Sequence, residues 1–105
     1  MIELNKENFE EEVLKAEGPV LVDYWGPTCE PCKALMPHIH ELAEKYGDKV
    51  KFASLDITKA RRLAIKQKVL GLPAIIMYKD GEEVERLAES EATAEAVEEM
   101  VKKYI

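Results

Sequence analysis

The stretch "WGPTCEPCK", residues 25 to 33, holds the only two cysteines of a 105-residue chain. It continues "PVLVDYW", residues 19 to 25, a nearly unbroken apolar run typical of a strand buried on both faces. From about Cys29 to Tyr46 the apolar period becomes helical, with one face formed by Leu35, Ile39, Leu42, Ala43 and Tyr46. We therefore predict that the cysteine pair lies at a strand-to-helix junction.

Four further stretches have the character of strands. "VKFASLDI", residues 50 to 57, predicts a second buried strand, and "PAIIMYK", residues 73 to 79, a third. Asp80-Gly81 is a strong hairpin signal, and "EEVERLA", residues 82 to 88, alternates as a half-exposed strand does. "MIEL", residues 1 to 4, adds a short edge strand.

The first predicted helix covers "NFEEEVLKA", residues 8 to 16. Phe9, Val13 and Leu14 then share one face. Asn8 and Glu11 have the spacing of a capping box, with Asn5 as the alternative cap.

Two more helices are expected, one after the strand at residues 50 to 57 and one after the strand at residues 82 to 88. Thr58 is expected to cap a short helix that runs to about Gln67. A closing amphipathic helix from Thr93 to Tyr104 directs an apolar face inward, formed by Val97, Met100, Val101 and Tyr104. Within the long helix after Cys29, Pro37 is expected to cause a kink.

The order of these elements predicts an α/β fold. Strands that alternate with helices imply parallel pairing, and the hairpin adds an antiparallel edge. The expected architecture is a central mixed sheet with helices on both faces. A length of 105 residues suits one domain over residues 1–105 with one modest core.

Composition excludes several classes of function. The net charge is −6 and no stripe of Lys and Arg alternates with aromatic residues, so nucleic acid is a poor partner. No apolar run approaches the roughly 18 residues of a membrane helix, so no membrane role is expected. The acidic start "MIELNKENFEEE" resembles neither a secretory signal nor a transit peptide, which favours the cytoplasm. We expect a monomer, because no large apolar stripe is left over.

Position and spacing favour redox chemistry at Cys29 and Cys32. Residues three apart on a helix share a face, with Cα atoms roughly 5–6 Å apart, which suits a reversible disulfide. At the helix N-terminus the free N–H groups and the dipole favour a thiolate, so the pKa of Cys29 should fall below the free value of about 8.5. Cys29 is then the nucleophile that forms a mixed disulfide, and the deeper Cys32 resolves it. Pro31 suits the first helical turn.

Metal and structural roles remain as alternatives. A structural disulfide over so short a loop removes little chain entropy. Zinc needs four ligands, and the only histidines, His38 and His40, point to different sides of the same helix. Zinc shared between two chains stays open, while an iron–sulfur cluster meets the same shortage of ligands. We expect no metal.

The chain resembles the thioredoxin family over nearly its full length. The resemblance rests on "VDYWGPTCEPCK" at 22–33, "GLPA" at 71–74, "YKDGEEV" at 78–84 and the order of elements. It implies the thioredoxin fold, a central mixed β-sheet flanked by four helices. It also implies reduction of disulfides in client proteins by dithiol–disulfide exchange, with no cofactor beyond the Cys29–Cys32 pair, and electrons supplied by a thioredoxin reductase.

The resemblance also assigns roles around the cysteines. Asp23 interrupts an apolar strand, so burial should raise its pKa towards neutrality, and it matches the family's aspartate that moves protons for the second cysteine. Pro73 matches the family's cis-proline. The resemblance implies that the docking groove is formed by two short segments: Trp25, Gly26, Pro27 and Thr28, and Leu72, Pro73 and Ala74.

Four residues depart from the most familiar thioredoxin pattern. Thr28 replaces a tryptophan, which puts broad substrate range in doubt, and Glu30 replaces a glycine beside the thiolate. Like charge disfavours the Cys29 thiolate, so we expect a higher Cys29 pKa than with glycine, although an acid is welcome in a first helical turn. Glu30 and Pro31 are both expected to modulate the site. Ala74 follows the proline where threonine is common, and Ser54 stands where many members have a lysine near the aspartate.

The Glu-Pro pair and "GPTC" most resemble thioredoxins of amino-acid-fermenting anaerobes, whose partners include a glycine, sarcosine or betaine reductase.

Two other functions compete with a disulfide reductase. One is a protein-disulfide oxidase or isomerase of the same fold, which differs in redox potential. No cation stands between the cysteines, and this argues against a strong oxidant. The other is a binding module in which the thiols are incidental, which would keep its function after both cysteines are replaced by serine.

Overall fold

Five strands form one mixed sheet in the computed structural model, which describes residues 1–105. β1 (Ile2–Glu3), β3 (Lys51–Asp56) and β2 (Pro19–Trp25) are parallel neighbours. β4 (Ala74–Lys79) pairs antiparallel with β2, and β5 (Glu82–Ala88) pairs antiparallel with β4. The strand order is β1-β3-β2-β4-β5, which confirms the predicted mixed sheet.

The direction of β4 differs from the simple alternation expected from the sequence. A parallel partner of β2 would need a connection that returns along the whole sheet. The helix between β3 and β4, α2 (Arg61–Lys66), has six residues and is about 9 Å long, against about 20 Å for a strand of six residues. The chain therefore stays at the end of the sheet where β3 finishes, and β4 begins there. This places the start of β4 beside the end of β2.

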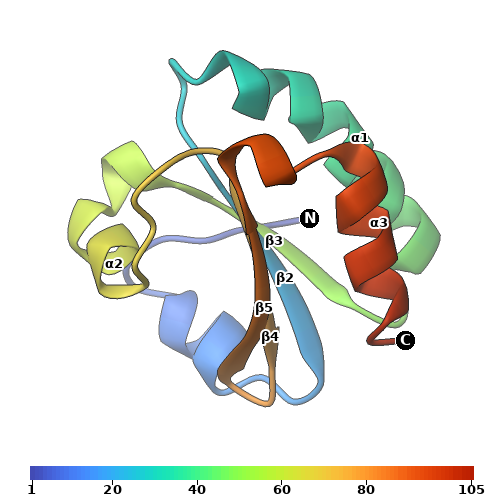
Figure 1. Ribbon diagram of the computed structural model, residues 1–105. Coiled ribbons are helices and arrows are strands. Elements are labelled where there is room, and N and C mark those ends of the chain that lie inside the picture. The colour runs from blue at the N-terminus through green and yellow to red at the C-terminus, as the bar shows by residue number, and fades with distance from the viewer.

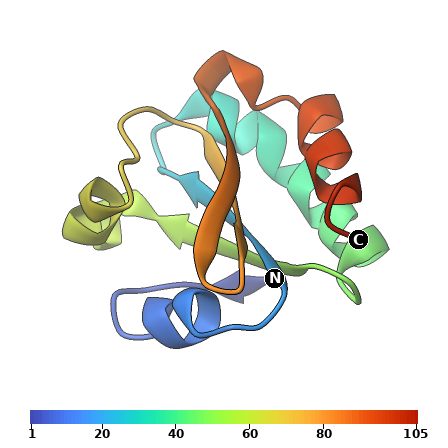
Figure 2. The same cartoon turned by 60° about the horizontal axis from the view of Figure 1, so that its bottom comes forward.

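Helices cover both faces of the sheet, as predicted. Figures 1 and 2 show α1 (Glu30–Tyr46) and α3 (Ala94–Lys102) on one side, with α2 and the short π-helix η1 (Glu10–Leu14) on the other. No helix is both long enough and apolar enough to span a bilayer. Two short 3₁₀ turns, η2 (Ile57–Lys59) and η3 (Glu89–Glu91), complete the chain.

The sheet separates two hydrophobic cores. Alternate residues of β2 point to opposite faces, so Val20, Val22 and Tyr24 enter one core and Leu21 the other. The first core adds residues of η1, α2 and their flanks, including Phe9, Val13, Ala60 and Ala64. The second adds residues of α1 and α3, including Leu35, Ile39, Leu42, Val97, Met100 and Val101.

The start of the first helical segment corrects the predicted cap. The Asn5 side chain accepts hydrogen bonds from the N–H groups of Glu7 (2.9 Å) and Asn8 (2.8 Å), and the Asn8 side chain accepts one from the Asn5 N–H (2.7 Å). The alternative cap, Asn5, is therefore confirmed and forms the capping box with Asn8, whereas the pairing of Asn8 with Glu11 is wrong. Phe9 and Val13 are buried as expected, whereas Leu14 is 39% exposed, because the wider π turn rotates it away from the core.

The cap predicted at Thr58 is also wrong. The Asp56 carboxylate accepts hydrogen bonds from the Thr58 N–H (2.9 Å) and hydroxyl (2.7 Å), so Asp56 caps η2 and Thr58 is a donor. The closing helix α3 is present as predicted, and Thr93 caps it, since its Oγ1 accepts from the Ala96 N–H at 3.1 Å. Tyr104 is half-buried and its hydroxyl donates to Glu85 at 3.1 Å.

The β4–β5 hairpin turns at Asp80-Gly81, as the sequence predicts. Both residues have positive φ, 52° and 85°, as a tight two-residue turn requires. A Cβ at Gly81 would collide with the Leu14 carbonyl oxygen, and Asp80 accepts a hydrogen bond from the Gly18 N–H at 2.8 Å. The turn is thereby packed against the η1–β2 connection, at the end of the sheet opposite the cysteines.

Candidate active site

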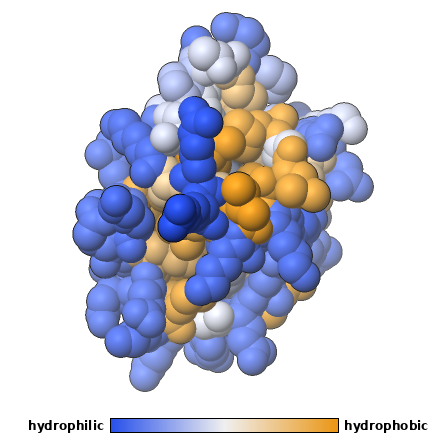
Figure 3. All heavy atoms as spheres, turned by 90° about the vertical axis from the view of Figure 1, so that its left-hand side faces the viewer, coloured by the Kyte–Doolittle hydropathy of each residue, from blue (hydrophilic) through white to orange (hydrophobic).

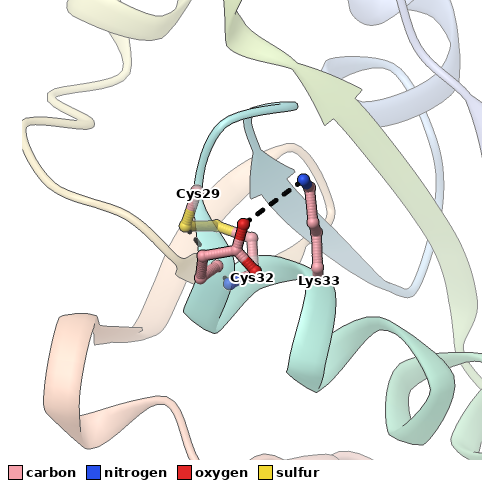
Figure 4. The surroundings of a disulfide bond; sticks show 4 residues. Cys29, Cys32 and Lys33 are labelled. Atoms are coloured by element: carbon pink, nitrogen blue, oxygen red, sulfur yellow. Dashed lines mark hydrogen bonds and ion pairs between the residues drawn. A yellow bond between two sulfur atoms is a disulfide. The ribbon is translucent and has the colours of Figure 1, made fainter.

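Cys29 and Cys32 form a disulfide at the N-terminus of α1 (Figure 4). Cys29 is the N-cap residue, in an extended conformation, and its Sγ accepts a hydrogen bond from the Cys32 N–H at 3.2 Å. The Cα atoms are 5.3 Å apart, inside the range expected from the spacing. The predicted strand-to-helix junction is confirmed, with β2 ending at Trp25 and α1 beginning at Glu30.

The loop between β2 and α1 fixes Cys29 at the helix entrance. The Cys29 N–H donates to the Gly26 carbonyl at 3.1 Å, and the Cys29 carbonyl accepts from the Lys33 N–H at 3.2 Å. Pro31 occupies the first turn, where an N–H would have no partner inside the helix. The Cys32 N–H of this turn donates to the Cys29 sulfur, and the helix N-terminus is a position that favours negative charge.

The two cysteines differ in their access to solvent. Cys29 is half-buried, whereas Cys32 is only 1% exposed. A disulfide of another protein can therefore reach the sulfur of Cys29 more readily than that of Cys32.

Glu30 and Lys33 form an ion pair on the outer side of the disulfide. Lys33 Nζ lies 3.5 Å from Glu30 Oε1, and Figure 4 shows this contact beside the two sulfurs. Both side chains are largely exposed, so the pair contributes little to stability. Its charges matter more, because Lys33 offsets the negative charge that Glu30 brings next to Cys29. Lys33 was not among the residues selected from the sequence, although its position three residues after Glu30 is the usual signal for such a pair.

Asp23 lies in β2 and is buried, with 1% of its surface exposed. Its Oδ2 atom has no hydrogen-bond partner. Burial raises the pKa of Asp23 from 3.8 to about 7, as expected from its apolar surroundings. No nearby cation opposes this shift, since the neighbouring position on β3 is occupied by Ser54.

A cavity of about 520 Å³ lies behind the disulfide. Its wall includes Cys32, Ser54, Trp25, Met36 and His40. Ser54 is the cross-strand neighbour of Asp23, so this hollow connects the region of the buried carboxyl with the inner cysteine. Met36 and His40 were not predicted as part of the site. Their helical spacing from Cys32, four and eight residues, places all three on one face of α1.

The loop before β4 lies against the cysteine loop. The Leu72–Pro73 peptide bond is cis, as the resemblance implies. A Cβ built on Gly26 would lie 3.2 Å from Leu72 Cδ1, which shows how closely the two loops approach. The N–H and C=O of Leu72 make no backbone hydrogen bond, so both are free to pair with another chain. The carbonyl of Pro73, in contrast, accepts from the Glu89 N–H at 2.7 Å.

The residues selected for docking differ in exposure. Pro27 and Thr28 are exposed, and Trp25 and Leu72 are half-buried. Gly26, Pro73 and Ala74 are buried. Ala74 is paired within the sheet to Tyr24 and Ala88 and is only 1% exposed, so its side chain does not frame a groove. The cause is that β4 begins at Ala74, so this residue is paired inside the sheet and does not belong to the loop before it.

No group of three or more His, Cys, Asp or Glu side chains is arranged to hold a metal ion. His38 and His40 line different hollows, one towards α3 and one behind Cys32, which confirms that they point to different sides of α1.

Comparison with known proteins identifies relatives over the full chain. The family model "Thioredoxin" matches residues 1–103. A thioredoxin of Acetoanaerobium sticklandii is 61% identical over 105 residues, covering 100% of both chains. A thioredoxin of Peptoclostridium acidaminophilum is 50% identical over 105 residues, covering 100% of this chain and 96% of the relative. A thioredoxin of Tissierella creatinophila is 77% identical over 44 residues, which is 42% of this chain and 100% of that sequence.

Proposed function

This chain belongs to the thioredoxin family and is a thiol–disulfide oxidoreductase that reduces protein disulfides, and we propose that Cys29 attacks the client while Cys32 resolves the mixed disulfide. The difference in exposure carries this assignment, since Cys29 is half-buried and Cys32 is 1% exposed. The N-cap position of Cys29 adds support, because an anionic sulfur is favoured there.

The proposed exchange transfers two electrons from the dithiol to the client. The Cys29 thiolate attacks one sulfur of the client disulfide, and the other client sulfur leaves as a thiolate that takes a proton from water. The Cys32 thiol then loses its proton, and its sulfur attacks Cys29 Sγ. The second client sulfur leaves as a thiolate, and the protein is left with the Cys29–Cys32 disulfide that the structure contains.

We propose that Asp23 accepts the proton of Cys32. A pKa of about 7 leaves this carboxyl able to take up and release a proton near neutral pH, as a general base requires. The hollow shared by Cys32 and Ser54, the neighbour of Asp23, supports a route for this proton through water.

Docking is proposed to use the rim around Cys29. Trp25, Pro27 and Thr28 would contact the client on one side, with Leu72 on the other. The free N–H and C=O of Leu72 can hydrogen-bond to an extended client segment. Gly26 and Pro73, both buried, would shape the two loops from within. Glu30 and Pro31 would modulate reactivity.

The family implies thioredoxin reductase as electron donor and disulfide-containing proteins as clients, with the cysteine pair as the redox group. We further propose a client in a glycine, sarcosine or betaine reductase system, which the similarity to the thioredoxins of Acetoanaerobium and Peptoclostridium supports. We also propose that residues 1–105 form a single domain and that the protein is a monomer. Its proposed location is the cytoplasm, where thiols are kept reduced.

Trapping tests the assigned order of the cysteines. Cys32→Ser should accumulate a mixed disulfide between Cys29 and a client peptide, visible by intact mass, because the resolving sulfur is missing. Cys29→Ser should accumulate none. The reverse pattern would assign the attack to Cys32, and the absence of any adduct in both variants would contradict the proposed mechanism.

A further inference from the structure

Positive charge is concentrated in one short segment of an acidic protein. Five of the fifteen Lys and Arg residues lie between positions 59 and 68, and no Asp or Glu occurs from 57 to 79. None of the five takes part in any of the seven ion pairs. They belong to α2 and its flanks: Lys59, Arg61, Arg62, Lys66 and Lys68. Such a field attracts an acidic partner.

The same segment exposes large apolar side chains. Ile65 is 67% exposed and Leu70 is 90% exposed, the two highest values for large hydrophobic residues in the protein. Beside them a hollow of about 280 Å³ is lined mainly by apolar residues, including Ala64 and Val69. Figure 3, which faces the α2 side of the molecule, shows apolar atoms gathered in one patch crossed by strongly hydrophilic side chains. We call the surface of Arg61, Arg62, Ile65, Lys66 and Leu70 the α2 face.

The α2 face is held in place from beneath. Arg86 of β5 donates to the carbonyls of Gln67 and Lys68, both at 2.9 Å, at the end of α2. The Tyr78 hydroxyl donates to the Gln67 side chain at 2.8 Å. These contacts fix the backbone at the end of α2, so little backbone entropy is lost there when a partner binds.

The face continues directly into the active site. Leu70 is two residues before Leu72, whose side chain lies against Gly26 in the loop that carries Cys29. The α2 face therefore adjoins the rim at which a client is proposed to bind. On the other side, β5 limits the basic area, since Glu83 is close enough to act on Lys68 and the Glu89 carboxylate lies next to Gly71.

We propose that the α2 face is a docking surface for client proteins whose reactive disulfide is bordered by an acidic, partly apolar segment. This inference rests on the proposed function and adds the chemistry of the client. Arg61, Arg62 and Lys66 supply attraction and orientation, and Ile65 and Leu70 supply apolar contact. The absence of aromatic residues in this segment argues against nucleic acid.

A pair of disulfide-bridged peptides tests the proposal. The two share the cystine and a leucine, and differ only in a neighbouring segment that is rich in glutamate in one and in lysine in the other. The measured quantity is the ratio of their second-order rate constants with the reduced wild-type protein, in which the intrinsic reactivity of Cys29 cancels. We expect the glutamate peptide to react faster, with an advantage that shrinks as salt is raised.

A matched pair of charge reversals locates the effect. Arg61→Glu with Arg62→Glu should lower the ratio roughly tenfold, because attraction becomes repulsion. Acids in a first helical turn are favourable, so α2 should remain folded. Lys49→Glu with Lys79→Glu changes the net charge equally at exposed, unpaired positions on the opposite end of the sheet, and should alter the ratio much less.

Three outcomes would overturn the proposal. Equal effects of both double variants would mean that net charge alone decides. If the wild type showed no preference for the glutamate peptide, the α2 face would have no docking role. The oxidoreductase function would still stand if the protein continued to reduce the neutral hydroxyethyl disulfide. A concentration-dependent dimer that is lost in Leu70→Ser would assign the face to a second copy of this chain.

Discussion

Lys33 lies 3.5 Å from Glu30 across the first turn of α1, immediately outside the Cys29–Cys32 disulfide. Glu30 introduces a negative charge next to Cys29, the sulfur that we propose attacks the client, and Lys33 supplies the opposite charge within the same turn. We therefore expect the reactivity of Cys29 to depend on the pair rather than on Glu30 alone.

Substitutions in this pair should change the thiolate population of Cys29. In the reduced protein, Lys33→Gln leaves Glu30 unopposed and should lower the alkylation rate constant at neutral pH roughly two- to threefold, because like charge disfavours the anion. Glu30→Gly should raise it by a similar factor. Rates of iodoacetamide reaction across pH give both values. Unchanged rates in both variants would show that solvent screens the pair completely.

The buried carboxyl of Asp23 should make the folded protein less stable as pH rises. Its pKa is raised to about 7, so between pH about 4 and 7 the folded state binds a proton that the unfolded state releases. The free energy of unfolding then falls across this range, by on the order of 4 kcal/mol from this group. Asp23→Asn should remove that slope and be more stable than the wild type at pH 8.

Urea titrations of the oxidised protein at pH 5 and pH 8 measure this difference. Asp48→Asn, at an exposed aspartate, is the matched control and should keep the wild-type slope. Parallel pH profiles for the wild type and Asp23→Asn would contradict a raised pKa at this site.

A cation at position 54 should reverse part of the rise in the pKa of Asp23. Ser54 pairs with Asp23 across the sheet and lines the cavity of about 520 Å³, which offers room for a longer side chain. Ser54→Lys should lower the pKa of Asp23 and move the pH-dependent loss of stability to lower pH. Ser54→Met, similar in length and without charge, should leave the pKa at its raised value or above. Carbon NMR titration of the Asp23 carboxyl distinguishes these outcomes.

Asp23→Asn should also slow the resolution of the mixed disulfide. Loss of a positioned base typically costs on the order of 10² in rate. Single-turnover measurements should show an unchanged first attack by Cys29 and a slower release of the client. A slowed first step with normal resolution would place the role of Asp23 elsewhere.

The redox couple itself should have the potential of a reductant. Equilibration of Cys29/Cys32 against graded dithiol buffers should give a two-electron midpoint near −270 mV. A midpoint near −120 mV would place the protein among strong oxidants.

The fold was largely predictable because each strand signal was local. "PVLVDYW" became β2 and "EEVERLA" became β5 with the expected boundaries, and Asp80-Gly81 adopted the turn that its residue types favour. Errors arose where the outcome depended on neighbours in space. The direction of β4 follows from the short reach of α2, and the exposure of Leu14 follows from a π turn that no apolar pattern encodes.

In the candidate site, too, local features were predictable from the sequence, and features that depend on neighbours in space were not. The cysteine positions followed from spacing and capping, and the raised pKa of Asp23 followed from its apolar neighbours. The exposure of Leu70 and the burial of Ala74 could not be predicted, because both depend on where the loop ends and β4 begins. The Glu30–Lys33 pair could have been found from spacing alone.

The central place of β2 has a consequence for local stability. It is paired along its length to β3 on one side and β4 on the other, and it delivers the chain directly to Cys29. Amide hydrogens in such a strand exchange with solvent only when the whole domain opens. We therefore expect β2, the strand that leads to the cysteine pair, to be among the slowest segments to exchange, in the oxidised and in the reduced protein alike.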